Sequence, residues 1–266
     1  MILYAYDWRW LYLFAKERQH RIYLMLKENN AVTTSALVEH FGVSIETIRR
    51  DLLEIEHNGL LVRVHGGAVL SSDMKPYMNL LDRNKVHVEQ KQDLALNALK
   101  FISEGDIIGL DSGSTAISLA KALKERFTRL TVITHSLDVF NIICDTFSVI
   151  LCSGYYLPEE NAFYGPLALD MLKNLYMQKA FIFPSAVSLE YGICDYQKDL
   201  YQIQKQMIYS SDEIYILADS SKFEKKALLK VSDMKKEYTY VTDSDISEEL
   251  KILYQKHNIN LCIGRN

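Results

Sequence analysis

The stretch VSIETIRRDLLEIEHNGLLVRVHGGA, residues 43–68, decides the fold of the N-terminal part of the chain. Ser44 is a good N-cap, because its hydroxyl can accept hydrogen bonds from the unpaired N–H groups of a first helical turn. Apolar residues then recur at intervals of three and four, which predicts an amphipathic helix. Its buried face is expected to hold Ile45, Ile48, Leu52 and Ile55, and its exposed face Thr47, Arg50, Asp51 and Glu54.

The residues after this helix predict its end and a two-stranded wing. Asn58-Gly59 supplies a residue that readily takes positive φ, so the helix is expected to end there. Residues 60–64 alternate apolar and polar side chains, with Arg63 exposed, which predicts a short strand. His65-Gly66-Gly67 then predicts a tight turn that only small residues permit.

Two helical patterns precede the stretch. Residues 16–27 carry apolar side chains on one face, and Thr33 or Thr34 can cap a shorter helix that runs to Phe41. Gly42 provides the turn before the third helix. Two helices, a glycine turn, a third helix and a two-stranded wing are arranged as in a winged helix-turn-helix, which is a DNA-binding fold.

Residues 31–68, AVTTSALVEHFGVSIETIRRDLLEIEHNGLLVRVHGGA, resemble the N-terminal domain of the DeoR family of bacterial transcriptional regulators. The family's pattern is V-S-x-x-T-I-R-R-D-L followed by G-x-L-x-R-x-H-G-G-A, and its glycines, arginines and histidine all match here. The resemblance implies contacts with double-stranded operator DNA by Ser44, Glu46, Thr47, Arg49 and Arg50 of the recognition helix and by Arg63 and His65 of the wing.

The chemistry of these side chains suggests how the contacts divide. The arginine fork can pair with guanine in the major groove or with a phosphate, and hydroxyls suit either the backbone or base edges. We expect Arg50 and Thr47 to contact base edges, and Arg49, Arg63 and Ser44 to contact phosphates. An isolated pair of arginines would more often be only a solvated helix face.

The composition is that of an ordinary globular protein. The 266 residues are 48% hydrophobic and 24% charged, with a net charge of −4, and they suffice for one large or two modest domains. Residues 1–75 hold nine Lys and Arg against nine Asp and Glu, so affinity for DNA must come from the placement of the arginines and from dimerisation. We expect no metal site, no cofactor and four reduced core cysteines, which are Cys144, Cys152, Cys194 and Cys262.

The first fourteen residues, MILYAYDWRWLYLF, are unusually aromatic. Asp7 and Arg9 interrupt the run, which is too short to span a bilayer and lacks the features of a signal peptide. It is either translated from an upstream start codon or an additional helix that packs Trp8, Trp10 and Phe14 on a neighbour. We divide the chain into an N-terminal extension at 1–15, a DNA-binding domain at 16–70, a linker at 71–83 and a second domain at 84–266.

The second domain is predicted to be α/β. A helix is expected from Asn84 to Ile102, and short apolar strands then alternate with helical stretches, which is the pattern of a largely parallel sheet. Ligands of such sheets bind beyond the carboxyl ends of the strands. The expected strands span residues 107–110, 130–134, 149–151, 180–183, 214–218, 238–242 and 261–263.

Small polar residues follow several of these strand ends. The sequence Asp-Ser-Gly-Ser-Thr at 111–115 lies between a strand and a helix, where N–H groups, hydroxyls and the positive end of the helix can bind an anion such as a phosphate. A simple loop and helix cap is the other interpretation. The remaining polar residues at strand ends are Thr134, His135, Ser136, Ser153, Gly154, Asp219 and Lys222.

This domain resembles the effector-sensing domain of DeoR regulators, which is related in fold to ribose-5-phosphate isomerase. The resemblance covers residues 75–245, rests on the Asp-Ser-Gly-Ser-Thr turn and on Ser-Ser-Lys-Phe at 220–223, and matches Arg83 and Lys91 to the Arg and Lys of the family's leading helix. It implies a pocket for a phosphorylated sugar, in which Ser112, Gly113, Ser114 and Thr115 hold the phosphate, Asp111 and Asp219 bind sugar hydroxyls, and Lys222 neutralises charge.

The sequence departs from the family's pattern at three strand ends. Thr134-His135-Ser136 stands in place of T-N-S, Ser153-Gly154 in place of two glycines, and residues 183–186 in place of a stretch that contains glycine. Pro184 and Ala186 add bulk where backbone and ligand come close, so the ligand is unusual or binds weakly. His135 could donate to an anion, but we favour a satisfied histidine at a strand end.

The resemblance implies a cytoplasmic repressor of a sugar-metabolism operon, whose affinity for DNA falls when a phosphorylated sugar binds the second domain. A homodimer or higher homo-oligomer is expected, since symmetric half-sites multiply a modest affinity. One alternative is a sugar-phosphate isomerase in which Asp111, Asp219 and Lys222 act as acid and base. Another is a DNA-binding protein whose effector pocket has lost its function. A recognition helix and wing have no use in an isomerase, so we expect no enzyme.

Overall fold

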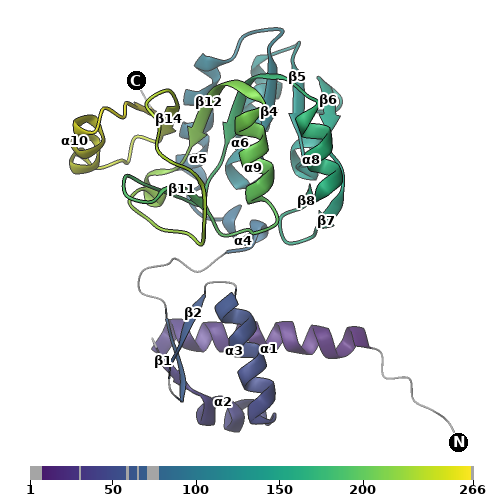
Figure 1. Ribbon diagram of the computed structural model, residues 1–266, viewed down its shortest axis with the longest axis vertical. Helices are drawn as coiled ribbons and strands as arrows, with labels where there is room; N and C mark the ends of the chain where they lie inside the picture. The colour runs from purple at the N-terminus through teal and green to yellow at the C-terminus, as the bar shows by residue number, and fades with distance from the viewer. Residues whose placement is uncertain (1–7, 30, 58–59, 65, 71–77, 265–266) are drawn as a thin grey trace, which may run out of the picture. The chain divides into compact units, whose positions relative to one another are not determined.

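The computed structural model describes residues 8–29, 31–57, 60–64, 66–70 and 78–264. The chain divides into two compact units, Met1–Tyr77 and Met78–Asn266 (Figure 1). Across the described residues, no helix has both the length and the apolar character that crossing a membrane requires.

The first unit consists of helices and a small antiparallel sheet, which confirms the predicted winged helix-turn-helix pattern. The sheet has three strands in the order β1-β3-β2. Its helices are α1 (Trp8–Asn29), α2 (Thr34–Phe41) and α3 (Ile45–His57), and its strands are β1 (Ala31–Thr33), β2 (Leu61–Val64) and β3 (Gly67–Leu70).

Local hydrogen bonds explain where these helices begin and end. The Thr33 hydroxyl accepts from the N–H of Ala36, 3.2 Å away, and caps α2. Gly42 ends α2 in the left-handed conformation, at φ 63°, where glycine costs least. Ser44 Oγ accepts from the N–H of Thr47 at 3.2 Å, so the predicted cap of α3 is confirmed.

The apolar face of α3 packs in the core of the first unit, with one exception. Ile48, Leu52 and Ile55 are buried as predicted, but Ile45 is 46% exposed. Ile45 is the first residue of α3. The prediction that Asp51 is exposed is also wrong, because this residue is only 2% exposed.

Several further expectations for this unit need correction or fall outside the described residues. Helix α1 begins at Trp8 instead of residue 16, and the wing gains β1 as a third strand. The side chains of residues 8–14 are not described, so the predicted packing of the aromatic residues there is not tested. Asn58-Gly59 and His65 also lie outside the described residues.

The second unit is built on a seven-stranded sheet with the order β15-β14-β12-β9-β4-β5-β6. Every neighbouring pair of strands in this sheet is parallel, which confirms the α/β prediction. The strands are β4 (Ile107–Leu110), β5 (Thr131–Thr134), β6 (Ser148–Leu151), β9 (Met177–Ile182), β12 (Ser211–Leu217), β14 (Thr239–Thr242) and β15 (Leu261–Ile263).

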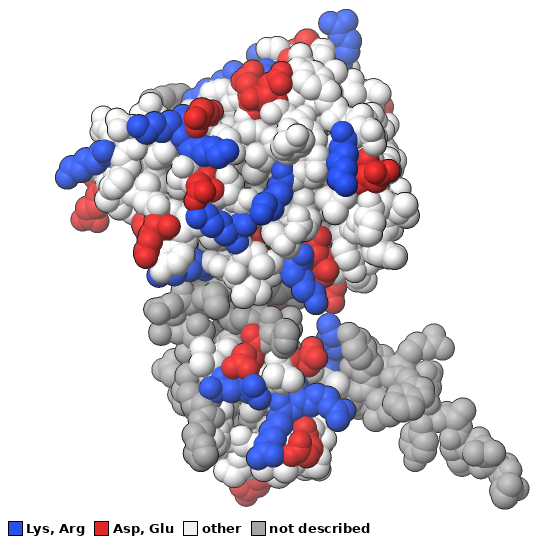
Figure 2. Space-filling model, in the orientation of Figure 1, with Lys and Arg blue, Asp and Glu red and all other residues white. Residues whose placement is uncertain are grey.

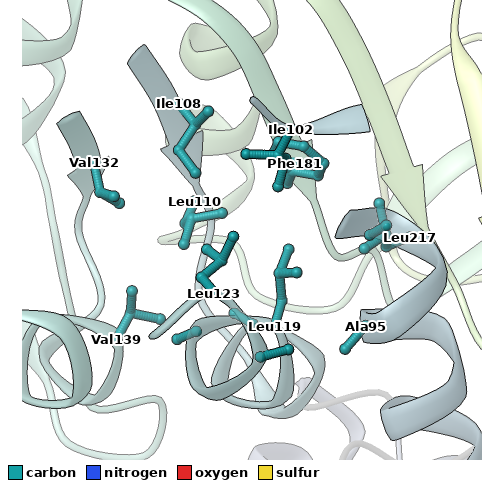
Figure 3. Close-up of a cluster of buried hydrophobic side chains, with 14 of the residues drawn as sticks. Ala95, Ile102, Ile108, Leu110, Leu119, Leu123, Val132, Val139, Phe181 and Leu217 are labelled. Carbon is teal, nitrogen blue, oxygen red and sulfur yellow. The ribbon is translucent and has the colours of Figure 1, made fainter. Parts of the chain in front are cut away.

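Helices cover both faces of this sheet. Side chains of α5, α6 and α7 form one hydrophobic core with the sheet, where Leu119 and Leu123 of α6 lie against Leu110 (Figure 3). Side chains of α8, α9 and α10 belong to the core on the other face. The helices are α5 (Val88–Ala98), α6 (Ser114–Arg126), α7 (Leu137–Ile143), α8 (Pro166–Lys173), α9 (Tyr201–Tyr209) and α10 (Glu248–Lys256).

Several short elements were not predicted. A hairpin of β7 and β8 follows β6, and β10, β11 and β13 form a second, antiparallel sheet. The short helices are α4 (Leu80–Arg83), η1 (Leu99–Phe101) and η2 (Ser220–Lys222), and the strands are β7 (Tyr155–Leu157), β8 (Ala162–Tyr164), β10 (Ala186–Ser188), β11 (Gly192–Asp195) and β13 (Leu229–Ser232).

Two predictions about the second unit are wrong in detail. The continuous helix expected from Asn84 to Ile102 begins only at Val88, because His87 takes the left-handed conformation at φ 51°. The four cysteines are free, but Cys144 is exposed and is not a core residue.

Candidate functional site

The predicted recognition surface lies on α3 and the wing. Ser44, Glu46, Arg49 and Arg50 are exposed, Thr47 is half-buried, and Arg63 projects from β2 with its side chain 42% exposed. The Ser44 and Thr47 hydroxyls lie 2.9 Å apart. The N-terminal half of α3 therefore presents the Ser44 hydroxyl and two arginines to solvent, with the half-buried Thr47 hydroxyl beside Ser44.

Two of these arginines already have carboxylate partners. Arg49 Nη1 lies 2.7 Å from Glu46 Oε1, with side-chain exposures of 59% and 69%. Arg63 Nε donates to Glu56 Oε2 at 2.5 Å, and the Arg63 backbone N–H donates to the same carboxylate. Exposed pairs of this kind contribute at most about 1 kcal/mol, so a phosphate can displace the carboxylate.

A buried ion pair holds α3 against α1. Arg18 Nε donates to Asp51 Oδ2 at 2.5 Å, and Gln19 Nε2 donates to Asp51 Oδ1 at 3.0 Å. Asp51 follows the two arginines directly, so its anchored side chain fixes the rotation of α3 and with it the direction of the arginines. The periodicity of α3 predicted an exposed Asp51, because a pattern within one helix does not reveal a partner on another helix.

The charges on the first unit are mixed. In Figure 2, Lys and Arg side chains of this unit lie next to Asp and Glu, in agreement with the balanced count for residues 1–75. Contact with DNA must therefore depend on where individual arginines are placed.

The Asp-Ser-Gly-Ser-Thr turn lies between β4 and α6, as predicted. Gly113 has φ 120°, which favours glycine, although a Cβ there would meet no atom within 4 Å. The Thr115 side chain is 1% exposed, and its Oγ1 has no hydrogen-bond partner among the described residues. A buried, unsatisfied hydroxyl at the N-terminus of a 13-residue helix fits an anion that enters there.

Arg83, Lys91 and Lys222 lie close enough to one another to interact electrostatically, and we call them the cationic cluster. Lys222 Nζ donates to Pro184 O at 2.7 Å. Burial lowers the pKa of Lys91 to about 8, with Lys222 and Arg83 acting in the same direction and Asp219 opposing them. Burial also lowers the pKa of Lys222, and Asp219 opposes that shift.

Asp219 is the acidic neighbour of this cluster. It is 2% exposed and accepts from the hydroxyl and N–H of Ser221. Burial alone would raise its pKa, but Lys222 and the Ser221 hydroxyl reverse the effect, and the pKa is lowered. The carboxylate is therefore ionised at neutral pH and offsets part of the positive charge.

Asp111 is fully buried, and both of its oxygens are engaged by the protein. Oδ1 accepts from the N–H of Ser112 at 2.7 Å and lies 3.0 Å from His135 Nε2. Oδ2 accepts from the N–H of Phe183 at 3.2 Å and from Gln204 Nε2 at 2.9 Å. In this arrangement Asp111 joins three of the loops that follow the carboxyl ends of the parallel strands, instead of presenting a free acceptor to a ligand. We call this edge of the sheet the rim.

His135 is buried, in line with the interpretation as a satisfied histidine. Its Nδ1 lies 2.9 Å from Phe163 O, which can only accept, so Nδ1 carries a proton. Its Nε2 lies 3.0 Å from Asp111 Oδ1. His135 thus links the end of β5 to the β7–β8 hairpin.

The other predicted residues at strand ends have mainly structural partners. Thr134 Oγ1 accepts from the N–H of Ser136, and Ser136 Oγ caps α7 by accepting from the N–H of Val139. Ser153 is exposed. A Cβ at Gly154 would lie 2.4 Å from Tyr164 O, so close packing requires glycine at this position.

Sequence reasoning did not place three residues that complete the rim. Gln204 of α9 donates to both Asp111 and Asp195, and its Oε1 has no partner within the described part of the chain. Arg83 and Lys91 were matched to the family but left out of the predicted site. An isolated buried Gln on an amphipathic helix would have been the only signal for Gln204.

A cavity of about 410 Å³ lies between α5 and α6. Lys91 and Ser114 form part of its lining, together with Asn84 and Val88. The cavity is large enough for a small organic ligand, and it reaches Lys91 of the cationic cluster and Ser114 at the N-terminus of α6.

Comparison with known proteins identifies both units. Residues 18–73 match the model of the DeoR-like helix-turn-helix domain, and residues 86–244 match that of the DeoR C terminal sensor domain. The lactose phosphotransferase system repressor of Lactococcus lactis subsp. lactis is 34% identical, with 88% of this chain and 93% of that protein covered. The L-fucose operon activator of Haemophilus influenzae is 30% identical, with coverages of 91% and 97%.

The family's proteins and these relatives are regulators and not enzymes, which confirms the predicted regulator over the isomerase alternative. Among solved structures, ribose 5-phosphate isomerase A from Methanocaldococcus jannaschii matches 52% of this chain and 56% of its own, with 20% identity and a TM-score of 0.39. The matched domains and the whole-length relatives show that the chain belongs to the DeoR family of DNA-binding transcriptional regulators.

Proposed function

We propose that this protein represses an operon of sugar metabolism and releases its operator when a phosphorylated sugar binds the second unit. The observation on which this proposal rests is the cationic cluster of Arg83, Lys91 and Lys222, of which Lys91 lines a cavity together with Ser114 of α6. Glu160 and Asp219 offset part of this buried positive charge, and a bound anion would stabilise the cluster further. The names of relatives, which include regulators of fucose and lactose systems, support the sugar.

We divide the site residues of the second unit into ligand contacts and structural residues, according to the hydrogen bonds that they make. We assign the phosphate to Ser112, Gly113, Ser114, Thr115 and the cationic cluster, and a sugar hydroxyl to Asp219. Asp111 and His135 are assigned to holding the rim, because their polar atoms already have protein partners. Thr134, Ser136 and Gly154 hold the neighbouring loops, and Ser153 stays a candidate contact on the exposed edge.

For the first unit, we assign base contacts to Arg50 and Thr47. Phosphate contacts are assigned to Ser44, Arg49, Arg63 and His65, and Glu46 is assigned to positioning Arg49. We further propose a cytoplasmic homodimer or higher homo-oligomer, with the DNA-binding domain at 16–70 and the effector domain at 84–266.

The test is a calorimetric screen of pentose and hexose phosphates, each with its free sugar as control. A ligand present at a hundred times its dissociation constant should stabilise the protein by ~2.7 kcal/mol. Lys222→Ala should abolish binding and leave DNA affinity intact, whereas Lys225→Ala, an exposed neighbour, should change neither. If free sugars bind as well as their phosphates, or if Lys222→Ala binds normally, the assignment is wrong.

A further inference from the structure

Residues 78–88, which we call the junction, connect the two functional sites along the chain. They begin directly after residues 71–77, which lead to the DNA-binding unit, and they end at the start of α5. The short helix α4 lies within the junction. The junction is therefore the described part of the second unit that lies nearest along the chain to α3 and the wing.

The start of the junction is fastened to the turn between β7 and β8. The Leu80 N–H donates to Glu159 O at 3.2 Å. Arg83 forms an ion pair with Glu160, whose side chain is only 2% exposed. Such a pair is strong only while both partners are present.

Lys91 fastens the end of the junction. Its ammonium donates to Arg83 O and, at 2.7 Å, to Val86 O. Between these carbonyls and α5 lies His87, in the left-handed conformation at φ 51°. A left-handed residue other than glycine persists only where its surroundings hold it, and Lys91 supplies that restraint.

Of the two cations, Lys91 lines the candidate anion site, and Arg83 lies near enough to Lys91 to act on its charge. Asn84 and Val88 of the junction line the cavity between α5 and α6, beside Lys91 and Ser114. An anion at the N-terminus of α6 would therefore compete with Arg83 O, Val86 O and Glu160 for the cations that hold the junction. The N–H groups of Arg83 and Lys91 cannot hydrogen-bond fully to both the anion and their present protein acceptors.

We propose that the junction is the element that couples the anion site to the DNA-binding unit, and that Arg83 and Lys91 exchange their protein acceptors for the anion. The inference rests on the proposed function for the identity of the anion. When the cations turn to the ligand, the junction loosens and the affinity of the protein for DNA falls. By linkage, DNA that favours the fastened junction weakens binding of the anion by the same factor.

The first measurement is hydrogen–deuterium exchange of the full chain, with inorganic phosphate and a panel of hexose phosphates as probes. A bound probe should speed exchange over residues 78–88, because the junction loses its restraints. Exchange over α8, whose buried side chains belong to a different hydrophobic core from those of α5, is the internal control. A probe that binds without changing exchange over 78–88 would overturn the proposal.

The second measurement uses Glu160→Gln, which weakens the ion pair between Glu160 and Arg83 without removing a ligand-binding group. Affinity for a duplex selected from a random pool should fall on the order of tenfold in the absence of ligand, towards the value of the ligand-bound wild type. Binding of the phosphate probe should persist. Glu237→Gln, the same change at an exposed position, should alter neither quantity.

Lys91→Met provides an independent variant in case Glu160→Gln does not fold. It should raise exchange over 78–88 and lower DNA affinity by a similar factor. If exchange rises while DNA affinity stays at the wild-type value in the variant that folds, the junction does not control the DNA-binding unit. If no phosphate compound binds the wild type but both variants still lose DNA affinity, the anion assignment fails and the junction stands as the control point.

Discussion

The recognition surface of α3 and the rim of the second unit both depend on charged side chains, but they differ in burial. Arg49 and Glu46 form a pair in which both side chains are more than half exposed. Asp111 and Glu160, by contrast, are 0% and 2% exposed. Exposed pairs exchange partners at little cost, which suits reading DNA, whereas buried charges depend on each other and suit switching.

The largest expected effect is on the buried side of this comparison. Asp111→Ala would leave the N–H groups of Ser112 and Phe183, the Gln204 amide and the His135 ring without their acceptor. We expect a loss of ~3–5 kcal/mol in the free energy of unfolding of the second unit. Urea unfolding followed by circular dichroism measures it.

Asp170→Ala, an exposed aspartate of α8, is the matched control and should stay within about 0.5 kcal/mol of the wild type. If Asp111→Ala costs as little as this control, the four contacts contribute nothing to stability and the contrast between the two regions fails.

The second prediction concerns the exposed side and separates its two arginines. Arg50→Ala should cost about 1–3 kcal/mol of DNA affinity and relax preference at one operator position. Arg49→Ala should weaken binding to all sequences alike and reduce the salt dependence by about one ion. Selection from a random duplex pool, followed by titration at several salt concentrations, distinguishes the two. An identical loss without any change in preference for both variants would refute the division.

The two regions also differ in how far the sequence predicts them. The exposed face of α3 follows from one helix, so a cap, a period and a glycine turn sufficed to place Ser44, Arg49 and Arg50. Asp51 was misplaced because its partner Arg18 lies on another helix. Local periodicity predicts which way a side chain points only when no distant partner redirects it.

The rim was predictable in outline and not in detail. Strand ends of a parallel sheet meet at one edge, and the structure places His135 Nε2 3.0 Å from Asp111 Oδ1 there, while the partners of Asp219 are Ser221 and Lys222. The contribution of Gln204 depends on how α9 packs, and the break at His87 depends on the carbonyl contacts of Lys91. Neither leaves a periodic signal, because both arise from tertiary contacts between distant residues.

A third prediction tests whether the positive charge of the buried Lys91 contributes to the binding of a phosphate. The pKa of Lys91 is lowered to about 8, so its ammonium becomes neutral as the pH rises through that value. Affinity for a phosphate ester that is already a dianion should fall by about tenfold between pH 7 and 9, since binding then requires uptake of a proton. Calorimetry in buffers of different ionisation enthalpy would detect this proton.

Lys91→Met should bind the phosphate ester weakly, and its affinity should not change between pH 7 and 9. If the affinity of the wild type is also constant over this range, Lys91 does not have the proposed role.

The free energy of unfolding should change with pH in the opposite direction to the affinity. The unfolded chain keeps the ordinary pKa of 10.5, so between pH 8 and 10.5 it binds more protons than the folded chain. The contribution of Lys91 to the free energy of unfolding therefore rises with pH in that window.

The smallest expected effect is at Glu46, and it tests the exposed ion pair of Glu46 with Arg49 on the recognition surface. Glu46→Gln breaks the pair with Arg49, which at this exposure should change the free energy of unfolding by less than about 0.5 kcal/mol. Affinity for DNA should rise slightly for all sequences, because Arg49 no longer exchanges a carboxylate for a phosphate. If Glu46→Gln instead changes preference at one base pair, Glu46 accepts from a base edge, and the carboxylates of α3 read sequence as well as position the arginines.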